Sequence, residues 1–488
     1  MEIVSSYVRE QERYTKNDLK DIFSFADNEV ERFIKNLKAF GVLKSVKNRN
    51  DQMEMSELTD EDIEITDDTA ESGDCLYVFT YVGIITCGSR IIKVYPKYLL
   101  TEQDHLESMK QVLKVLERYS RSEEQIINVF NGDGDNRSFN MLAVILYLLN
   151  DYYEYGIYTN SEDIVEVNGD GDILWGKTID ESFALLQDNK PYYMELYTGR
   201  TVDDDMDYFK RLHECILTDC SEQLHTAQLD ILFDIDQIIL SEEELDDFGD
   251  TDYILERIQK ELNIQFNTRR QILLKTLYAY VAQNRRLLEN NDGISMYGTT
   301  AFHAVWENVC AEVFDNKLRT SLGKLNMSVP LSKEYTPSDM LIDIIEKPVW
   351  KGPDTEEKRA SDTLIPDLIS IPKIGKEDYF LIFDAKYYNL RLEKGKTLGG
   401  NPGIGDVTKQ YLYQLAYKKF IKAHNIAVVK NCFLMPTEKN EIIDKGTAKM
   451  EMLEVLGLEN IQIRLMPAAI MYEYYLTQRK IDVALLNL

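Results

Sequence analysis

Apolar residues near the start of the chain recur at the spacing that places side chains on one face of a helix. The clearest stripe consists of Val30, Phe33, Ile34 and Leu37. Another helix is expected to begin near Thr15, and Gly41 ends the stripe before the strand-like run Val42–Val46. Helix, turn, helix and strand are the outline of a winged helix. We therefore predict a winged-helix-like unit over residues 1–50 and leave open whether it binds DNA or protein.

The pattern changes after residues 51–74, which are strongly acidic and are predicted to form a linker. Two strand-like runs, Tyr77–Ile85 and Ser89–Tyr95, then predict a β-hairpin. From residue 103 the apolar spacing becomes helical, with a core stripe of Leu142, Ile145, Leu146 and Leu149. Further helices are expected at 205–218, 241–262 and 268–290. Residues 75–295 are therefore assigned to a β-hairpin followed by a helical region.

From about residue 299 the pattern becomes mixed. A helix is predicted over Thr299–Leu318, strands at 363–371 and 378–387, and a further helix with Asp406 as its N-cap. A strand and then a strand–helix tail complete the chain. This order is that of an αβββαβ core, which we assign to residues 296–488. The fold class of the whole chain is multidomain α+β.

The length of 488 residues exceeds one ordinary core and indicates about three or four domains. The longest purely apolar run, Met141–Leu149, is far shorter than the ~20 residues that a membrane helix needs. No apolar signal segment follows Met1. The six cysteines are scattered without CxxC pairs, which favours reduced thiols over a zinc module. We expect a cytoplasmic protein that does not associate with membranes.

The net charge of −29 is unevenly distributed along the chain. Residues 51–74 contain 11 acidic residues and no Lys or Arg, and residues 201–260 contain 18 acidic residues against 4 basic ones. Residues 345–430, in contrast, hold 15 basic and 11 acidic residues. Because the electrostatic footprint of a nucleic-acid site is local, the overall sign does not exclude DNA binding. It argues against tight nonspecific binding of DNA by the isolated chain.

The positive region contains Pro366-Asp367 and, further on, Asp384-Ala385-Lys386 at the end of an apolar run. Residues two apart on a strand project to one face, so Asp384 and Lys386 should face the same pocket. Two aspartates suit Mg²⁺, with the Ala385 carbonyl as a further oxygen ligand. Such a metal would activate a water, and Lys386 would orient that water or stabilise the charged transition state. This order of groups predicts a metal-dependent phosphodiesterase.

Two helices should flank these strands and contribute polar residues. On the helix before them, Glu307 lies opposite the apolar stripe and would supply a third carboxylate for the metal. His303, one turn earlier, is better explained as an ordinary helix histidine than as a ligand. On the helix after them, Gln410 and Gln414 are four residues apart and share a face. Their amides are predicted to bind the DNA backbone or to support the site.

Taken together, these motifs resemble the PD-(D/E)xK nucleases, with Asp384 as the variable acidic position. More narrowly, residues 75–480 resemble the nuclease subunits of the LlaJI and McrBC restriction systems, and the first fifty residues lie outside the match to McrC. The matching pieces are Tyr81–Ile85, Val94–Lys97, Ile173–Ile179, Trp306–Cys310, Pro366-Asp367, Asp384–Lys386 and Lys409–Gln414.

The resemblance implies cleavage of double-stranded DNA in a restriction system that defends against phage. Mg²⁺ would be the metal, with Mn²⁺ as a substitute, and GTP would act only through a separate McrB-like AAA+ GTPase motor. In the family, the part before the nuclease domain engages the motor ring. Dimerisation of nuclease domains stays open, as do the target sequence, its methylation, the cut positions and the stoichiometry with the motor.

Two alternatives to this reading remain. Gly171–Thr178 satisfies the P-loop pattern GxxxxGK[ST]. Three bulky apolar residues within it suit a strand better than a loop wrapped around phosphates, so we do not expect intrinsic nucleotide binding. The other alternative is a non-catalytic DNA-binding or assembly adaptor on a nuclease-like scaffold. Metal-dependent stabilisation that requires Asp384 would distinguish the nuclease from the adaptor.

Overall fold

The computed structural model describes residues 3–48, 63–66, 76–101, 103–122, 140–159, 162–169, 171–187, 190–202, 207–283, 287, 294–353, 356–395 and 397–488. Most of the predicted acidic linker lies outside these residues. The chain divides into two compact units, which are described separately. The first combines Met1–Arg137 with Met296–Leu488, and the second is Ser138–Ser295. The predicted β-hairpin therefore belongs to the same unit as the predicted nuclease domain.

The first unit begins with two short strands, two helices and a further strand. Their bounds are β1 (Val4–Arg9), β2 (Arg13–Tyr14), α1 (Lys16–Phe23), α2 (Asp27–Ala39) and β3 (Leu43–Asn48). The hydroxyl of Thr15 accepts the backbone N–H of Asp18 at 3.1 Å and caps α1. The apolar stripe of α2 is buried, as its spacing predicts. The two helices and the following strand lie where the pattern placed them.

The strands around these helices belong to two different sheets. The first has the order β2–β5–β3–β4, with β4 at Ile63–Thr66 and β5 at Leu76–Phe79. The second has the order β1–β7–β6–β13, with β6 at Val82–Cys87, β7 at Arg90–Tyr95 and β13 at Ile294–Thr299. Strand β1 runs parallel to β7, so the first residues of the chain are part of the hairpin sheet. The N-terminal fifty residues do not form a separate sheet of their own.

The run predicted as one strand from Tyr77 to Ile85 is broken between β5 and β6. The backbone N–H of Thr80 donates to the Val42 carbonyl at 3.0 Å and continues the β3–β5 register one residue past Phe79, before β6 begins. Gly83 has a φ of +140°, and a Cβ there would lie 2.2 Å from the Tyr297 carbonyl oxygen. The chain thus turns from one sheet into the next where only glycine allows β6 to approach β13 so closely.

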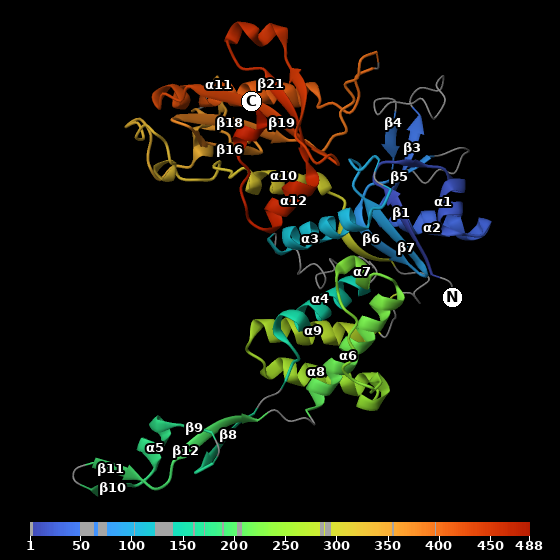
Figure 1. Ribbon diagram of the computed structural model, residues 1–488, viewed down its shortest axis with the longest axis vertical. Helices are drawn as coiled ribbons and strands as arrows, with labels where there is room; N and C mark the ends of the chain where they lie inside the picture. Colours follow the sequence, from blue (N-terminus) through green and yellow to red (C-terminus); the bar gives the residue numbers. More distant parts are fainter. Residues whose placement is uncertain are drawn as a thin grey trace. The chain divides into compact units, whose positions relative to one another are not determined.

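A larger sheet with the order β16–β18–β19–β21–β20 forms the C-terminal part of this unit (Figure 1). Its strands are β16 (Leu368–Ser370), β18 (Glu377–Ala385), β19 (Val428–Thr437), β20 (Ile443–Ala448) and β21 (Ile461–Pro467), with β17 (Lys373–Ile374) paired to β18. Strands β18, β19 and β21 run parallel, whereas β16 and β20 are antiparallel to their neighbours. Both faces of β18 are buried, which explains its continuous apolar run.

Helix α11 covers one face of this sheet, and α10 and α12 lie on the other (Figure 1). The helices are α3 (Leu106–Ser122), α10 (Phe302–Val313), α11 (Ile404–Ala423) and α12 (Ala468–Leu476). Phe380 packs on Tyr417 of α11, with ring centroids 5.0 Å apart, and Phe383 packs on Phe314 at 4.9 Å. Alternate residues of β18 therefore face opposite layers, and Asp384 shares the α11 face with Phe380.

The predicted bounds of α10 and α11 need correction. Helix α10 is shorter than Thr299–Leu318, and the N-cap of α11 is Gly403, not Asp406. Asp406 lies at the third helical position, from which its carboxylate accepts the Gly403 N–H at 3.2 Å. An aspartate in the first turn has the same sequence appearance as an N-cap.

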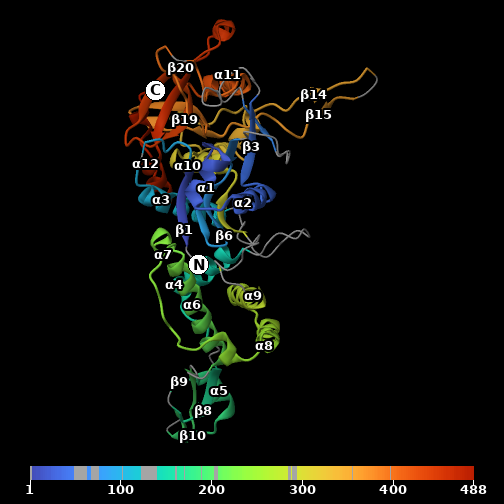
Figure 2. The ribbon, with the colours of Figure 1, turned by 90° about the vertical axis from the view of Figure 1, so that its right-hand side faces the viewer.

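The second unit consists of helices and a β insert that we define as residues 162–202 (Figure 2). The helices are α4 (Met141–Tyr155), α6 (Tyr208–Thr226), α7 (Asp230–Phe233), α8 (Thr251–Ile264) and α9 (Thr268–Gln283). The predicted apolar stripe of α4 is buried. Arg269 of α9 forms a bidentate ion pair with the buried Asp151 of α4, with distances of 2.9 and 2.7 Å.

The insert contains a three-stranded sheet of order β8–β12–β9, a short helix and a hairpin. Its elements are β8 (Glu162–Val167), β9 (Asp172–Ile173), α5 (Trp175–Glu181), β10 (Ala184–Gln187), β11 (Lys190–Tyr193) and β12 (Tyr197–Val202). The remaining short elements of the chain are β14 (Val349–Trp350), β15 (Lys358–Arg359) and the 3₁₀ helices at Leu245–Phe248, Leu322–Lys324, Leu341–Ile344, Glu451–Leu456 and Val483–Leu486. In the described part of the chain, no helix is long and apolar enough to cross a bilayer.

Candidate active site

The two aspartates singled out by their motifs lie side by side on neighbouring strands. In the β16–β18 pair, Leu368 is the partner of Phe383, so Asp367, just before β16, stands across from Asp384. The Asp367 carboxylate accepts the backbone N–H of Ala385 at 2.9 Å. The register of one antiparallel pair therefore brings both carboxyl groups to the same end of the sheet.

Asp384 is only 4% exposed and is held by groups on two elements. Its Oδ2 accepts a hydrogen bond of 2.8 Å from the side-chain amide of Gln410 on α11. Its Oδ1 lies 2.9 Å from the Lys386 ammonium, an ion pair without hydrogen-bond geometry. A metal ion bound at this buried oxygen would therefore share it with the Lys386 ammonium.

Lys386 lies between two carboxylates. Its ammonium is 2.9 Å from Asp384 and 3.0 Å from Asp406, in the first turn of α11. Burial lowers the pKa of Lys386, but the two carboxylates outweigh burial and raise it above the ordinary value. Asp406 was predicted only as a helix N-cap and not as a residue of the site. Its signal was its position four residues before Gln410, on the same helix face.

The electrostatics of the site reflect an excess of buried negative charge. Burial raises the pKa of Asp367, and the adjacent Asp384 and then Glu307 raise it further. Burial also raises the pKa of Glu307, while His303 and Lys386 act against this shift. Glu307 on α10 is thus part of the same electrostatic cluster. His303 is exposed and adjoins Glu307 on the rim.

Gln414 is placed differently from Gln410. Its side-chain amide donates to the Glu459 carbonyl at 2.9 Å and accepts the Glu459 N–H, also at 2.9 Å. Both ends of the amide are therefore used to fix the segment before β21. The structure brings Gln410 to the aspartates and assigns Gln414 to the support of the fold.

A cleft of about 1260 Å³ opens beside these residues. Its lining includes Glu307, Ala385 and Lys386, together with Tyr387 and the segment that follows it. Residues of the N-terminal strands and of the β19–β20 turn complete its walls. Neither Asp367 nor Asp384 is among its lining residues, so the cleft reaches the candidate site through Glu307, Ala385 and Lys386.

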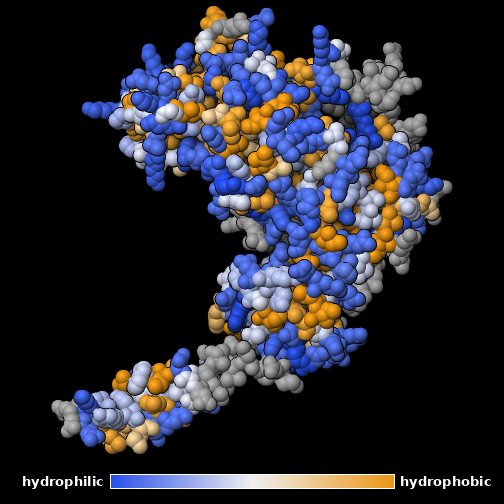
Figure 3. Space-filling model, in the orientation of Figure 1, coloured by the Kyte–Doolittle hydropathy of each residue, from blue (hydrophilic) through white to orange (hydrophobic). Residues whose placement is uncertain are grey.

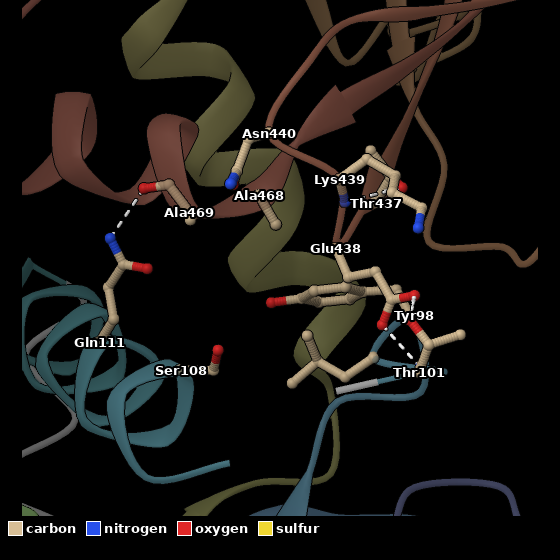
Figure 4. Close-up of a pocket in the computed structure, with 11 residues that line it drawn as sticks. Tyr98, Thr101, Ser108, Gln111, Thr437, Glu438, Lys439, Asn440, Ala468 and Ala469 are labelled. Atoms are coloured by element: carbon tan, nitrogen blue, oxygen red, sulfur yellow. Dashed lines mark hydrogen bonds between the residues drawn. The ribbon is translucent and has the colours of Figure 1, made fainter. Parts of the chain in front are cut away.

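A smaller pocket of about 250 Å³ adjoins this region between α3 and the β19–β20 turn (Figure 4). Glu438 on this turn accepts the backbone N–H groups of Leu100 and Thr101 at 2.7 and 2.9 Å. Gln111 on α3 donates to the Ala469 carbonyl at 2.7 Å. These contacts fasten the segment after β7 to the C-terminal sheet.

The P-loop match forms no phosphate-binding loop. Ile173 ends β9, and α5 begins two residues later at Trp175. The Thr178 hydroxyl, which a P-loop would direct to a metal ion, is buried and accepts the Tyr197 N–H at 3.0 Å. The segment is a strand–helix corner of the insert, which agrees with the rejection of this match.

The side chains of the site suit a divalent cation only in part. Two facing aspartates, one of them with a buried oxygen that receives no hydrogen bond, provide the hard ligands that Mg²⁺ prefers. Within the described residues, no three His, Cys, Asp or Glu side chains are close enough to form a metal site alone. A cation here would need further oxygens, such as the Ala385 carbonyl, water and phosphate.

The solved structures to which the chain is similar include two from Thermococcus gammatolerans. One is a half-complex from a tetradecameric assembly of McrB AAA+ hexamers with bound McrC, with 12% identity, a TM-score of 0.36 and coverage of 97% of this chain and 99% of that chain. The other is the McrBC complex, with 10% identity, a TM-score of 0.24 and coverage of 62% and 84%.

Sequence comparison gives a clearer relationship. The chain is 30% identical over 417 residues to the type II restriction enzyme BsuMI component YdjA of Bacillus subtilis (strain 168), covering 84% of this chain and 82% of the relative. Residues 81–471 match the profile of the LlaJI restriction endonuclease family. The chain therefore belongs to the LlaJI restriction endonuclease family and is a restriction-system protein.

Proposed function

We propose that the chain is the Mg²⁺-dependent DNA endonuclease subunit of its restriction system and hydrolyses phosphodiester bonds of double-stranded DNA. The observation that carries this proposal is the convergence of Asp367, Asp384 and Lys386 at one end of the β16–β18 pair, beside an open cleft. The order of α10, β16, β17, β18, α11 and β19 in the chain supports a PD-(D/E)xK core.

Each residue has a role that follows from its position. Asp367 and Asp384, with the Ala385 carbonyl, would hold the metal. Glu307 would add its negative charge from α10, since the described carboxylates do not form a group of three around one ion. When bound, the metal supplies Lewis-acid stabilisation of a phosphate oxygen and a more acidic water. Lys386 carries a fixed positive charge that orients the attacking water or stabilises the transition state. Gln410 and Asp406 are positioning residues, because they contact Asp384 and Lys386.

We further propose that the chain works with an AAA+ GTPase motor and binds no GTP itself. The relative YdjA is named as a component of a restriction enzyme, which supports action within an assembly. The β insert carries exposed apolar side chains, including Phe183 at 82%, Leu186 at 75% and Met194 at 73% exposure (Figure 3). Apolar residues gathered on an exposed segment support contact with a protein partner.

The test is the loss of cleavage on removal of one metal-binding side chain. Asp384→Ala should abolish Mg²⁺-dependent cleavage of plasmid DNA by the assembled system, because it removes the oxygen that Lys386 and the metal share. Glu377→Ala is the matched control, since Glu377 is an exposed acid on the same strand, β18. Cleavage by Asp384→Ala at the wild-type rate would refute the proposal.

A second measurement separates the nuclease from the adaptor. Mg²⁺ or Mn²⁺ should raise the thermal unfolding midpoint of the wild-type chain, because a ligand that binds only the folded state stabilises it. At tenfold excess over the dissociation constant the gain is about 1.4 kcal/mol. Asp384→Ala should lose this gain and Glu377→Ala should keep it. An adaptor shows no stabilisation that depends on Asp384.

A further inference from the structure

The walls of the cleft come from both ends of the chain. Among the described residues, seven basic ones line it, and three of them belong to the N-terminal part: Arg9, Arg13 and Lys97. The other four are Lys386, Arg391, Lys439 and Lys445. Five acidic residues line the same cleft, so its balance is positive in a chain whose net charge is −29. The cleft therefore differs in sign from the protein as a whole.

At least three of these five acidic residues already contact protein groups. One of them, Glu12, lies 3.4 Å from the Arg9 guanidinium and accepts a hydrogen bond of 2.9 Å from the Tyr14 hydroxyl. Glu438 accepts the N–H groups of Leu100 and Thr101. Glu10 is 6% exposed and accepts hydrogen bonds from the Tyr387 hydroxyl at 2.5 Å and the Lys97 N–H at 3.2 Å. The carboxylates of Glu10 and Glu438 are thus directed to groups of the wall, whereas the Glu12 carboxylate offsets part of the Arg9 charge.

The segment from Arg9 to Arg13 has a defined conformation. The N–H groups of Glu10 and Gln11 donate to the Tyr95 and Phe79 carbonyls, each at 2.9 Å. The N–H of Arg9 donates to the Tyr14 hydroxyl at 2.9 Å. Backbone bonds to both N-terminal sheets hold this segment in place, so the backbone that carries the two arginines is fixed before binding and only their side chains lose conformational freedom.

Lys97, which contacts this segment, is tied to the residues that follow β18. Besides its bond to Glu10, the Lys97 N–H lies 3.2 Å from the Tyr387 hydroxyl, and Asn389 donates to the Lys97 carbonyl at 2.7 Å. The Lys97 ammonium lies 4.6 Å from the centre of the Tyr387 ring. Because Tyr387 directly follows Lys386, the N-terminal wall is positioned relative to the reacting groups.

We propose that Arg9, Arg13 and Lys97 form a DNA-backbone contact wall that holds the duplex phosphates beside Asp384 and Lys386. This inference rests on the proposed nuclease function and extends it to the N-terminal part of the chain. Cations on a fixed wall bind phosphates of any sequence and set the register of the duplex, without reading bases. The wall therefore positions the scissile bond, and sequence recognition belongs elsewhere.

A winged helix usually contacts DNA through a different element. In that fold the second helix enters the major groove. Of the first fifty residues, as far as the structure describes them, those that line the cleft lie before α1, and none lies on α2. Lys35 is exposed on α2 and provides a matched cation of the same N-terminal part outside the cleft.

The experiment compares binding of a labelled duplex of about 30 base pairs to the full-length chain in EDTA, where no cleavage interferes. Arg13→Gln and Arg9→Gln should each weaken binding roughly fivefold at about 0.1 M salt. Each should also reduce the slope of log K against log salt by about 0.9, the signature of one lost phosphate contact. Lys35→Gln should leave both the affinity and the slope at wild-type values.

The following results would contradict the contact wall or the nuclease function. Unchanged affinity and slope in both arginine variants, or no detectable binding by the wild-type chain at low salt, would refute the contact wall. An effect of Lys35→Gln equal to that of Arg13→Gln would assign DNA contact to α2 instead. Cleavage that survives Asp384→Ala would refute the nuclease function, independently of the binding results.

Discussion

The Lys386 ammonium lies 3.0 Å from Oδ1 of Asp406, a residue that also closes the first turn of α11. This contact orients the lysine from outside the predicted motif, while Asp384 contacts it from within. In the proposed reaction Asp406 would therefore act through Lys386, whose ammonium both aspartates contact.

Asp406→Asn should lower the cleavage rate by about 10- to 100-fold, the usual range for a residue that orients a reacting group. The asparagine oxygen can still accept the Gly403 N–H, so the helix cap remains and stability should change by less than about 1 kcal/mol. Stabilisation by Mg²⁺ should persist because Asp367 and Asp384, the proposed metal ligands, are intact. Wild-type cleavage in this variant would show that Lys386 needs only Asp384.

The two glutamines of α11 should respond differently to truncation. Gln410→Ala removes the hydrogen-bond donor to buried Asp384 and should lower cleavage or metal affinity by about 10- to 100-fold. Gln414→Ala removes both bonds to the Glu459 backbone and should cost about 1–3 kcal/mol of unfolding free energy. Its specific activity per folded molecule should stay at the wild-type level. Cleavage assays combined with chemical denaturation of both variants test this division.

Glu307→Gln tests whether the carboxylate on α10 takes part in the reaction. Glu307 influences Asp367 electrostatically and lines the cleft, so a neutral side chain of equal size should weaken metal binding and lower cleavage at least about tenfold. The measurement is cleavage as a function of Mg²⁺ concentration. Glu312→Gln is the control, because Glu312 lies on the same helix and pairs with Arg118 at 2.5 Å. If both variants behave alike, Glu307 is an ordinary helix residue.

The β insert should bind the motor partner through its exposed apolar side chains. Phe183→Ser combined with Leu186→Ser should weaken co-purification with the AAA+ subunit more than about tenfold, since buried aromatic and aliphatic anchors dominate such interfaces. Phe266→Ser is the control, because Phe266 is 93% exposed but lies outside the insert. If both variants retain the partner equally, the insert does not bind the motor through these side chains.

Local patterns predicted the elements that hold the candidate site. The two-residue spacing of Asp384 and Lys386 placed them on one strand face, and the apolar stripes of α2, α4 and α10 are buried as their periodicity requires. The register of β16 against β18, which brings Asp367 to Asp384, follows from two strands close in sequence.

Long-range contacts left no local signal. Glu10 and Tyr387 are 377 positions apart, and no periodicity could place the N-terminal segment beside Lys386. The sequence also could not distinguish the roles of Gln410 and Gln414, because both lie on one face of α11. Only the position of Glu459 in space distinguishes Gln414 from Gln410. Tertiary packing, and not local sequence preference, determines both the position of the N-terminal segment and the difference between Gln410 and Gln414.

His213 of α6 makes the stability of the second unit depend on pH. The imidazole is fully buried, and its Nδ1 accepts the Tyr158 N–H at 3.0 Å, which requires the neutral ring. Burial, and then the charge of Arg269, lowers the pKa of His213 to about 3. An unfolded histidine has a pKa of about 6.5. Between these two values the unfolded state binds the extra proton, so stability falls as the pH falls.

The loss should reach about 1.4 kcal/mol per pH unit below pH ~6.5. His213→Asn offers a side-chain oxygen to the Tyr158 N–H without a titrating group, so its stability should vary less with pH over this interval. Hydrogen exchange of the α6 amides at about pH 7 and pH 5 measures the difference between the two proteins. Carboxylates elsewhere contribute equally to both and cancel. If the two proteins lose the same protection between these pH values, His213 is not the group that couples protonation to unfolding of this unit.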